Sequence, residues 1–452
     1  MLKYISRKRN IVDMVNYELG IDIIDILLAA VVIIMLAVSW YYLGFFFISF
    51  KKVPKAPKAD KYTKFAVLVP ARNESKVIDN IMRALYKQTY PKEFYDVWFI
   101  VEDEKDPTTT KATKRGFHYF VRDEITPQRK TKGFALQECI RYFKNNNIQY
   151  DAYMIFDADN VMEPEYLEKM NNVRQTGVQV CSGYRNFTNA STNWLTACSA
   201  TLFTYMNTFT SRGRTLLFKK ALLSGTGYYI DANIVDNAGG WIWTGLTEDT
   251  QLTGYCYYHD VNMRYYPRAM YYDEQSPSFK VCRLQHIRWT WGFLYKKRIF
   301  KANRKEINYH TISKYRHALA MFEYKVGMIP FVVSCILTFL LIVAALALSI
   351  ISIFDAPEYS QILFIHLIFE FLTLYSFFFV IAAITIGHER KYLKFNFATT
   401  LWACSTYCFF FLELFFAFLD GLIHPRKRHT WTPIKHTGKI DNKEAKKAAK
   451  KA

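Results

Sequence analysis

The chain has 452 residues, of which 51% are hydrophobic and 17% aromatic, and its formal net charge is +20. This length exceeds one ordinary domain, and the composition fits a protein that is partly water-soluble and partly embedded in a membrane. The basic residues gather beside apolar stretches, as at 51–58 and 426–428. That placement favours contact with anionic lipid headgroups and argues against a nucleic-acid-binding protein.

A basic N-terminal segment, residues 1–25, precedes an apolar stretch that we predict to be a transmembrane helix over 26–50. The stretch meets the requirement of roughly 20 residues for crossing a bilayer core. It is longer than the hydrophobic region of a signal peptide and leads into lysines, so we expect it to remain as an anchor.

Residues 51–300 are enough for one sizeable cytoplasmic α/β domain. Apolar strands are predicted at 64–70, 97–103 and 152–156, and they alternate with helical patterns. Such strands favour a parallel sheet covered on both faces. Ligands of these sheets bind beyond the carboxyl ends of the strands. Polar residues follow these ends: Asn73 and Glu74, Asp103, and Asp157 and Asp159.

Two carboxylates, Asp157 and Asp159, stand one residue apart where the third strand ends. One could bind a divalent cation while the other holds ribose or metal-bound water. Hard oxygen ligands together with substrate phosphates are the usual way of binding Mg²⁺ or Mn²⁺. The alternative is purely structural, with Asp159 capping a helix over 163–170.

A second acidic motif, Thr247-Glu248-Asp249, opens a predicted helix. A carboxylate at a helix N-terminus stays ionised, so it could accept a proton from an attacking hydroxyl. Without other motifs, a capping box with no chemistry explains this sequence equally well.

A third motif, Gln285-His286-Ile287-Arg288-Trp289, lies in an aromatic and basic helical stretch over 279–295. Gln285 and Arg288 share one helix face. Arg288 could bind a diphosphate through two hydrogen bonds, and Trp289 could stack on a sugar ring. Alternatively, the Arg and the Trp only anchor the helix at lipid headgroups.

Two shorter motifs complete the set. Lys132-Gly133 could place an ammonium group on a diphosphate, although a solvated basic loop is the usual alternative. The segment 224–227, with Thr226 and Gly227, could let the backbone approach an acceptor closely, and the alternative is a simple tight turn.

After these motifs we predict an amphipathic helix on the membrane surface over 301–327 and three transmembrane helices within 328–420. A basic tail, 421–452, would be solvated or in contact with the membrane. The acidic loop 355–359 is expected outside the cell. Three later spans would also put the basic tail outside, against the positive-inside rule, so one stretch does not cross or the count is wrong by one.

Taken in order and followed by apolar spans, the motifs resemble those of the processive family 2 glycosyltransferases. These include cellulose, hyaluronan, chitin, poly-N-acetylglucosamine and bacterial mixed-linkage β-glucan synthases. The resemblance covers residues 60–420 and lies in the joint occurrence of the motifs. It implies an α/β fold of the Rossmann-like GT-A type, inserted between transmembrane helices that form a channel. The expected location is a bacterial plasma membrane, crossed several times, with a cytoplasmic catalytic domain.

The resemblance also assigns roles to residues. Seven of them would contact the UDP part of the donor: Asn73, Glu74, Asp103, Lys132, Asp157, Gln285 and Arg288. Asp159 would ligate Mg²⁺ or Mn²⁺. Asp249, with Glu248 beside it, would be the base that deprotonates the acceptor hydroxyl. Three residues would bind the acceptor at the channel mouth: Trp289, Thr226 and Gly227.

Two positions depart from the family pattern. His286 stands where relatives more often have Arg or Gln, and the first acidic motif is Glu102-Asp103-Glu104. We favour Asp103 over Glu102 as the uridine ligand, which leaves the register of that motif open by one residue.

The favoured hypothesis is an inverting synthase that polymerises a UDP-sugar and secretes the polysaccharide through its own channel. UDP-glucose, giving a β-glucan, is favoured over the UDP-N-acetylglucosamine of a poly-N-acetylglucosamine or hyaluronan-like synthase. The alternatives are a nonprocessive glycolipid transferase and a nonenzymatic membrane scaffold. The expected partners are the UDP-sugar, the growing polysaccharide and membrane lipid, and the sequence does not indicate an oligomeric state.

Overall fold

The computed structural model describes residues 51–126, 129–299, 312–326, 357–424 and 440–449, together with 47–50, 438 and isolated positions within 19–45 and 340–350. The chain forms two compact units. One comprises Met1–Phe46 and Phe322–Ile381, and the other comprises Phe47–Met321 and Ala382–Ala452. The second unit contains every candidate site residue, and we call it the catalytic unit.

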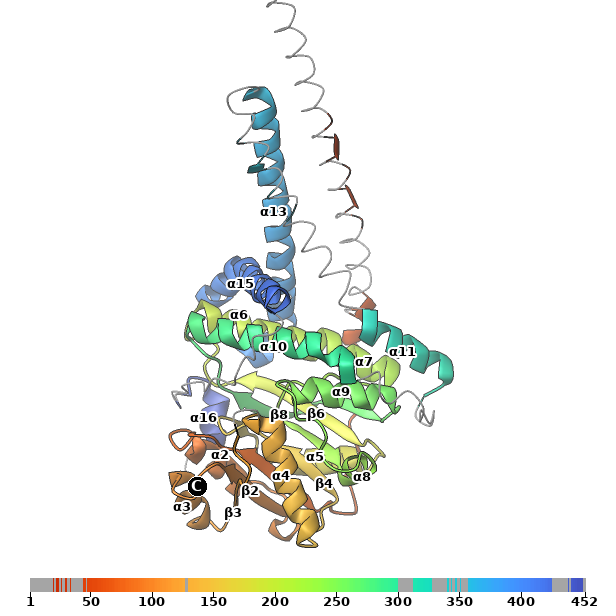
Figure 1. Ribbon diagram of the computed structural model, residues 1–452, viewed down its shortest axis with the longest axis vertical. Coiled ribbons are helices and arrows are strands. Elements are labelled where there is room, and N and C mark those ends of the chain that lie inside the picture. The colour runs from red at the N-terminus through yellow and green to blue at the C-terminus, as the bar shows by residue number, and fades with distance from the viewer. Residues whose placement is uncertain are drawn as a thin grey trace, which may run out of the picture. The chain divides into compact units, whose positions relative to one another are not determined.

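The core of the catalytic unit is an eight-stranded sheet in the order β3-β2-β1-β4-β7-β6-β8-β5 (Figure 1). Its strands are β1 (Phe65–Pro70), β2 (Tyr95–Val101), β3 (His118–Val121), β4 (Ala152–Ile155), β5 (Val161–Met162), β6 (Val180–Phe187), β7 (Tyr228–Asp231) and β8 (Met263–Asp273). β3, β2, β1 and β4 are parallel, as the sequence predicts. The other half is mixed, because β7 runs antiparallel to both β4 and β6. The prediction of a wholly parallel sheet is therefore wrong for this half.

The mixed topology brings more segments to one edge of the sheet than parallel strands alone would. The carboxyl ends of β1, β2 and β4 meet there, and the antiparallel β7 begins at the same edge. β6 and β8 run parallel to each other and antiparallel to β7, so they also end there. We call this edge the rim. All the acidic motifs of the sequence follow strands that end at it or open a helix beside it.

The helices of the catalytic unit alternate with the strands and then follow them. The first group is α2 (Ile78–Tyr86), α3 (Pro107–Thr113), α4 (Lys132–Asn145), α5 (Tyr166–Arg174), α6 (Trp194–Tyr205), α7 (Arg212–Phe218), α8 (Ala232–Asn237) and α9 (Glu248–Tyr258). The later group is α10 (Phe279–Ile299), the start of α11 (Lys314–Val326), the end of α13 (Pro357–His388), α15 (Phe397–Ile423) and α16 (Lys443–Ala449). The helix predicted to open at Thr247-Glu248-Asp249 and the one predicted over 279–295 are thus present.

In the part of the chain that the structure describes, two helical segments are long and apolar enough to cross a membrane: Leu367–His388 of α13 and Phe397–Ile423, which is α15. The predicted span over 26–50 and the part of 328–420 that precedes residue 357 lie largely outside the described residues, as does 301–311 of the predicted surface helix.

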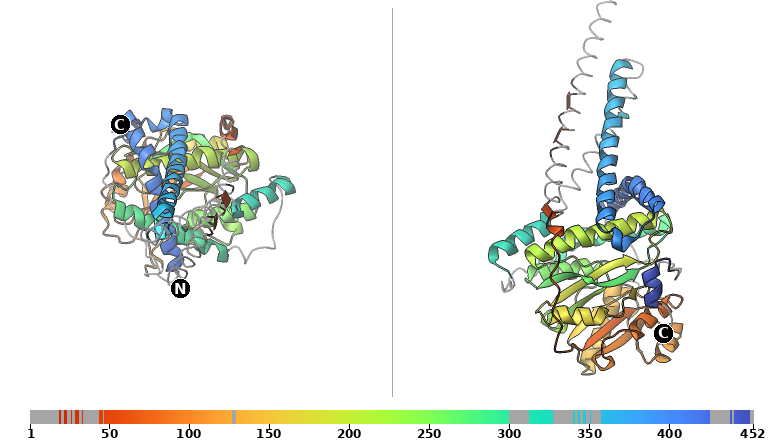
Figure 2. Two further views of the ribbon diagram at one scale, coloured as in Figure 1. Left: turned by 90° about the horizontal axis from the view of Figure 1, so that it is seen from above. Right: turned by 180° about the vertical axis from the view of Figure 1, so that it is seen from behind.

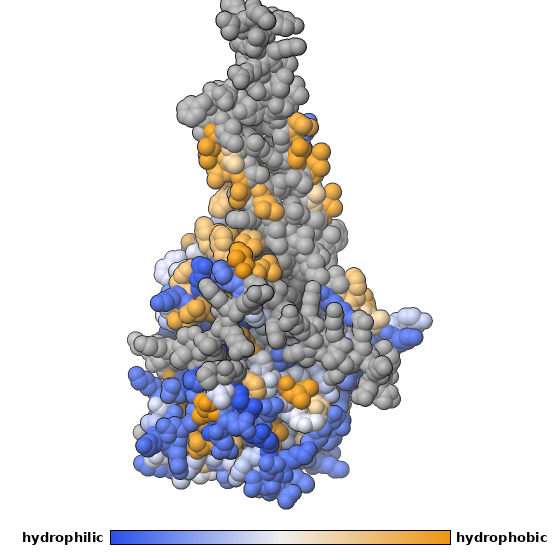
Figure 3. All heavy atoms as spheres, in the orientation of Figure 1, coloured by the Kyte–Doolittle hydropathy of each residue, from blue (hydrophilic) through white to orange (hydrophobic). Residues whose placement is uncertain are grey.

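One side of α15 packs along its length against α6 and α10 (Figures 1 and 2). The buried side has helical spacing over more than five turns: Thr399, Ala403, Cys404, Tyr407, Cys408, Phe410, Glu413, Ala417 and Gly421. The opposite side exposes large apolar residues: Leu401, Trp402, Phe409, Leu412 and Phe416. Figure 3 shows hydrophobic side chains near α15 and a mainly hydrophilic surface over α2 to α4. α15 therefore combines a face fitted to the catalytic unit with an apolar outer face.

The described C-terminal residues pack on the catalytic unit, so the prediction of a solvated or membrane-contacting tail is wrong for 441–449. α16 lies against α2, and Ala445, Ala448 and Ala449 are buried (Figure 2). The backbone N–H of Asp441 donates to the carbonyl of Thr188 at 2.7 Å. A lysine-rich composition hides this contact, because alanines spaced three and four apart form the buried face.

Candidate active site

Lys132 connects three of the predicted motifs at the rim. Its Nζ lies 2.5 Å from Oδ1 of Asp157 and donates to the carbonyl of Gly225 at 2.7 Å. The same atom is 3.9 Å from Oε1 of Glu248. Burial disfavours the charged form, but the charges of Asp157 and Glu248 outweigh it and raise the pKa of Lys132. Lys132 is therefore a fixed positive charge at the centre of the site, and it does not lie in a solvated loop.

Of the two acids of the second motif, Glu248 is buried and Asp249 is half-buried. Burial raises the pKa of Glu248 to about 8, against the effect of Lys132 and with that of Asp249. Burial also raises the pKa of Asp249, which the backbone N–H of Thr250 and the charge of Lys132 oppose. Oδ1 of Asp249 accepts the hydrogen bond from Thr250 N–H at 2.7 Å. Thr247 makes no side-chain cap, so a capping box does not explain this motif.

The loop of the first acidic motif is fixed by hydrogen bonds around Thr226. The hydroxyl of Thr226 accepts from the N–H of Asp157 at 2.9 Å and donates to the side chain of Asn160. Thr226 is 1% exposed, so its side chain shapes the loop from beneath. The predicted structural alternative fails, because α5 begins at Tyr166 and its N-cap is Glu165. Capping of this helix therefore does not explain Asp159.

Gly227 lies at a crowded position below the same loop. Its φ is +64°, and a Cβ there would be 2.1 Å from the Tyr271 ring. Its carbonyl accepts a hydrogen bond from the Tyr166 hydroxyl at 2.8 Å. The acceptor roles of Thr226 and Gly227 remain predictions, and what the structure describes for both residues is support of the rim.

Four carboxylates gather beside Asp159, and the sequence motifs included only some of them. Oδ2 of Asp159 accepts from the N–H of Glu274 at 3.2 Å. Burial and then the charges of Asp273 and Asp157 raise the pKa of Asp159 well above its usual value. Burial raises the pKa of Glu74 to about 7, and Asp157 and Glu274 add to the effect. The carboxylates beside Asp159 therefore carry more negative charge than they can share without repelling one another.

Arg185 neutralises part of this charge. Its Nη2 lies 2.5 Å from Oδ2 of Asp273, and its Nη1 donates to the carbonyl of Ser224 at 2.8 Å. Sequence analysis missed Arg185, Asp273 and Glu274. The signal for the two acids was a tyrosine-rich run over 263–272 that is followed by Asp-Glu, a further strand whose end carries carboxylates.

The acidic cluster fits a divalent cation that is completed by substrate. Among the described residues, no three His, Cys, Asp or Glu side chains form a group that could hold a metal ion by themselves. Mg²⁺ and similar ions commonly bind through one or two carboxylates, with water and substrate phosphates as the other ligands. The raised pKa values of Asp159 and Glu74 show that added positive charge would stabilise the ionised acids. Asp159 and its neighbour Glu274 suit this role.

The uridine residues of the sequence prediction follow β1 and β2. Asn73 is exposed and has a left-handed φ of 57°. Glu102 is engaged with Arg72, whose Nε lies 2.9 Å from its Oε2, whereas Asp103 is exposed. This arrangement favours Asp103 as the available carboxylate, although its contact with a base stays a prediction.

α10 contributes a second positive charge. Burial lowers the pKa of Arg288, while the charges of Glu248, Asp157 and Asp249 act in the opposite direction. The Nε of Arg288 is buried and has no hydrogen-bond partner in the described part of the chain. Gln285 lies on the same helix face and is half-buried. The geometry therefore provides a cation with unused donor capacity close to the carboxylates of the rim.

Close packing fixes the turn that leads into Glu248. A Cβ on Gly133, next to Lys132, would be 2.3 Å from the carbonyl oxygen of Trp243. A Cβ on Gly292 of α10 would be 2.1 Å from Oγ1 of Thr247. The hydroxyl of Thr131 donates to the carbonyl of Thr244 at 2.9 Å. The helices that bear Lys132 and Arg288 therefore both contact the turn that presents the two acids.

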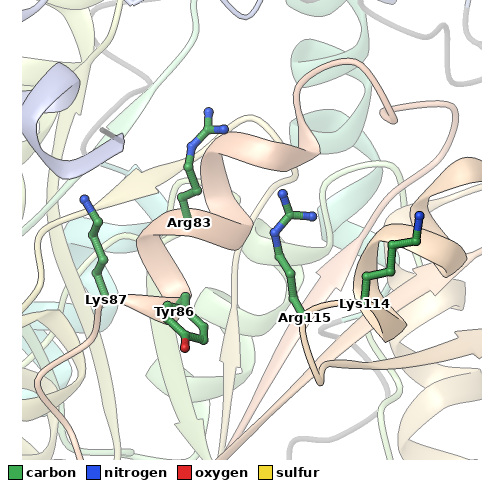
Figure 4. Close-up of a pocket in the computed structure, with 5 residues that line it drawn as sticks. All are labelled: Arg83, Tyr86, Lys87, Lys114 and Arg115. Atoms are coloured by element: carbon green, nitrogen blue, oxygen red, sulfur yellow. The ribbon is translucent and has the colours of Figure 1, made fainter. Parts of the chain in front are cut away.

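A basic pocket on another part of the surface is separate from the rim. Arg83, Tyr86, Lys87, Lys114 and Arg115 line it (Figure 4). They lie at the C-terminal ends of α2 and α3, near the amino ends of the parallel strands. Nε of Arg83 donates to the carbonyl of Ala449, and Nη2 of Arg115 pairs with Asp79 at 2.8 Å. The two arginines therefore serve helix packing.

Residues 63–292 match the family described as "Glycosyltransferase like family 2". The chain therefore belongs to this family. The chain is 28% identical over 260 residues to the probable glycosyltransferase YdaM of Bacillus subtilis, over 54% of this chain and 60% of that protein. It is 25% identical over 195 residues to the beta-monoglucosyldiacylglycerol synthase of Trichormus variabilis, over 42% and 40% respectively. The matches thus span less than two thirds of these relatives.

The fold is also similar to that of the mannosyltransferase PcManGT from Pyrobaculum calidifontis, solved with GDP-Man and Mn²⁺. The TM-score is 0.55 at 14% identity, over 88% of this chain and 99% of that protein. The family match and this similarity confirm the predicted α/β glycosyltransferase fold of the GT-A type, here with a mixed sheet.

Proposed function

We propose that the protein is an inverting, processive glycosyltransferase that polymerises a UDP-sugar, with UDP-glucose favoured, and secretes the polymer through a channel formed by its apolar helices. The observation that supports it is the contact of Lys132 with Asp157 and with the motif containing Asp249, with Arg288 near the same carboxylates. A donor diphosphate between Lys132 and Arg288 would place the sugar beside Asp249.

In this proposal the protein residues divide the work of one displacement step. Asp249 accepts the proton of the acceptor hydroxyl as its oxygen attacks the anomeric carbon from the side opposite the diphosphate, which inverts that carbon. A raised pKa makes a carboxylate a more effective base near neutral pH. Lys132 and Arg288 neutralise the charge that develops on the departing diphosphate. A bound Mg²⁺ or Mn²⁺ near Asp159 would supply further neutralisation of the phosphate oxygens.

A second candidate is transfer of a single sugar to a lipid acceptor. It is supported by the relative from Trichormus variabilis, whose name describes a glycolipid synthase. The donor half of the site would serve both functions equally. The two proposals differ in the acceptor, for which Trp289 offers a half-buried ring in contact with Phe203, the ring centroids being 5.7 Å apart.

The decisive experiment uses the purified full chain in lipid nanodiscs with radiolabelled UDP-glucose or UDP-N-acetylglucosamine and Mn²⁺. A long product that is degraded by a linkage-specific glycosidase supports the synthase. A lipid-extractable product with one sugar contradicts it and supports the second candidate. A matched set of donors, scored by UDP release, identifies the sugar.

We also propose a location at the plasma membrane in which α15 lies along the cytoplasmic surface and does not cross. Its buried side faces α6 and α10 from Thr399 to Gly421, and its outer side is apolar. The segments on either side of α15 are hydrogen-bonded to the same unit. The carbonyl of Tyr392 accepts from the side-chain amide of Asn186, and the backbone N–H of Asp441 donates to the carbonyl of Thr188. Without a fourth span, the basic tail lies on the cytoplasmic side, in agreement with the positive-inside rule.

A further inference from the structure

α10 has a second face whose residues do not point to the donor site. Gln285 and Arg288 share the face toward the rim. Cys282, His286 and Trp289 follow one another at intervals of four and three residues, so they form a neighbouring stripe. α10 packs on α15, which the stripe faces. Trp289 of the stripe also contacts Phe203 of α6.

His286 makes a buried polar contact with α15. Its Nδ1 is hydrogen-bonded to Oε2 of Glu413, and its Nε2 lies 3.5 Å from Sγ of Cys282. His286 is 0% exposed and Glu413 is 7% exposed. The imidazole also packs edge-on against Phe410, with ring centroids 5.2 Å apart. The departure from the family pattern at this position is therefore matched by a specific partner.

Glu413 is the one charged residue on the buried side of α15. Removing a carboxylate from water is costly, and an apolar residue of similar size would pack there without that cost. Oε1 of Glu413 has no hydrogen-bond partner among the described residues. Such a pair adds little to stability compared with apolar packing, but it accepts only one relative rotation and register of the two helices.

The relative rotation of α10 and α15 sets the orientation of the Trp289 ring. Its ring contacts the His286 ring, at 5.1 Å between centroids, and the Phe203 ring of α6. The guanidinium carbon of Arg185, the partner of Asp273, lies 3.9 Å from the centre of the Phe203 ring. The Trp289 ring is thus held between His286 of its own helix and Phe203 of α6.

We propose that His286 and Glu413 are positioning residues that set the orientation of Trp289 toward the acceptor and tie it to α15. This inference rests on the proposed role of Trp289 in acceptor binding. The pair acts on the acceptor side alone, because Gln285 and Arg288 lie on the other face of α10. Its loss therefore reduces the product formed per UDP released, as donor is lost to water, and leaves UDP binding unchanged.

The test compares four variants of the full chain in nanodiscs: His286→Leu, Glu413→Leu, the double variant and His286→Arg. Cys408→Ala, on the same buried side of α15, is the matched control for general damage. Three quantities are measured: binding of UDP with Mn²⁺, product formed per UDP released, and hydrogen exchange of the α10 backbone over 283–292. The last needs no donor or acceptor.

We expect His286→Leu and Glu413→Leu each to lower product per UDP released by roughly 10- to 100-fold, as a misplaced substrate does, with unchanged UDP affinity. His286→Arg should keep product per UDP released at the wild-type value, because arginine can pair with Glu413. The double leucine variant should be as stable as the wild type yet remain deficient, and α10 should exchange faster in all three leucine variants.

A double variant with wild-type product yield would mean that the pair only fills space, and it would overturn the proposal. Equal losses of UDP affinity and of product would do the same, as would unchanged exchange in α10. Product per UDP is defined for a polymer and for a glycolipid alike. A wild-type glycolipid product would therefore contradict processive synthesis while leaving this test intact, and an inactive wild type would leave the exchange measurement to decide.

Discussion

The chemistry of the candidate site depends on a few individual charged side chains. Lys132 and Arg288 come from different helices and face one set of carboxylates, of which Glu248 and Asp249 are buried or half-buried. Burial raises the pKa of both Glu248 and Asp249, and the positive charge of Lys132 opposes this rise in each. Opposite charges in a partly dry site interact strongly, so each substitution here should affect a specific step.

Asp249→Asn should lower the rate of transfer by about 10²- to 10⁴-fold, because the amide cannot accept the proton of the acceptor hydroxyl. UDP affinity should be preserved, since Asp249 contacts its own helix and not the predicted uridine residues. Transfer rate and UDP binding are measured on the same preparation, with Asp236→Asn on the exposed side of α8 as the control. Retained transfer would exclude Asp249 as the base.

Glu74 should make stability depend on both pH and metal. Burial raises its pKa from 4.5 to about 7, so between these values the folded chain holds a proton that the unfolded chain has lost. Stability without metal should therefore fall as pH rises through this window. Mn²⁺ favours the ionised form, so the rise in Tm that it produces should be larger at about pH 8 than at about pH 6.

The matched variant for this measurement is Glu74→Gln, which removes the titrating group. It should flatten the fall in stability between pH 4.5 and 7 relative to the wild type. A shift by Mn²⁺ that is the same at both pH values in the wild type would contradict the proposed link between metal and the acidic cluster.

At the scale of elements, helix packing brings the motifs together. Local patterns predict strands β1, β2 and β4 and helices α2, α9 and α10, because apolar periodicity and turn residues specify them. The antiparallel placement of β7 could not be predicted, since it depends on long-range pairing. For the same reason the sequence did not reveal that Asp273 and Glu274 lie beside Asp159, more than 110 residues earlier in the chain.

Gly292 is the point at which α10 touches the turn before Glu248. Gly292→Ala should destabilise the fold by about 1–3 kcal/mol through overpacking against Thr247. Transfer should fall roughly 10- to 100-fold because the turn and Arg288 can no longer both keep their places. The control is Gly387→Ala, where a Cβ meets nothing within 4 Å.

Adding Thr247→Ala to Gly292→Ala removes the clashing hydroxyl and methyl and should recover part of the lost stability and activity. Thermal unfolding and the transfer rate, measured on both variants, show whether stability and activity are recovered. Full activity in Gly292→Ala alone would show that the close contact does not position the acids.

At the scale of the molecule, the side of the membrane on which α16 lies distinguishes three spans from four. Lys447 is well exposed on α16. In Lys447→Cys, a membrane-impermeant maleimide should label inverted vesicles and not intact cells, relative to the parent chain. The expected control is Asp355→Cys, in the loop predicted outside, with the reverse pattern. Labelling of Lys447→Cys in intact cells would mean that α15 crosses.

The contact of the last described segment with the rim also governs the order in which the enzyme is assembled. The N–H of Gly438 donates to Oε2 of Glu274 at 3.0 Å, and its carbonyl accepts from Asn80 of α2, 358 residues earlier in the chain. α16 also packs on α2. At synthesis rates of about 5–20 residues per second, α2 is made roughly 20–70 s before Gly438 and α16. The apolar helices leave the ribosome within that interval. The contacts of Gly438 and α16 with the rest of the unit can therefore form only after the sequences of α13 and α15 have been synthesised.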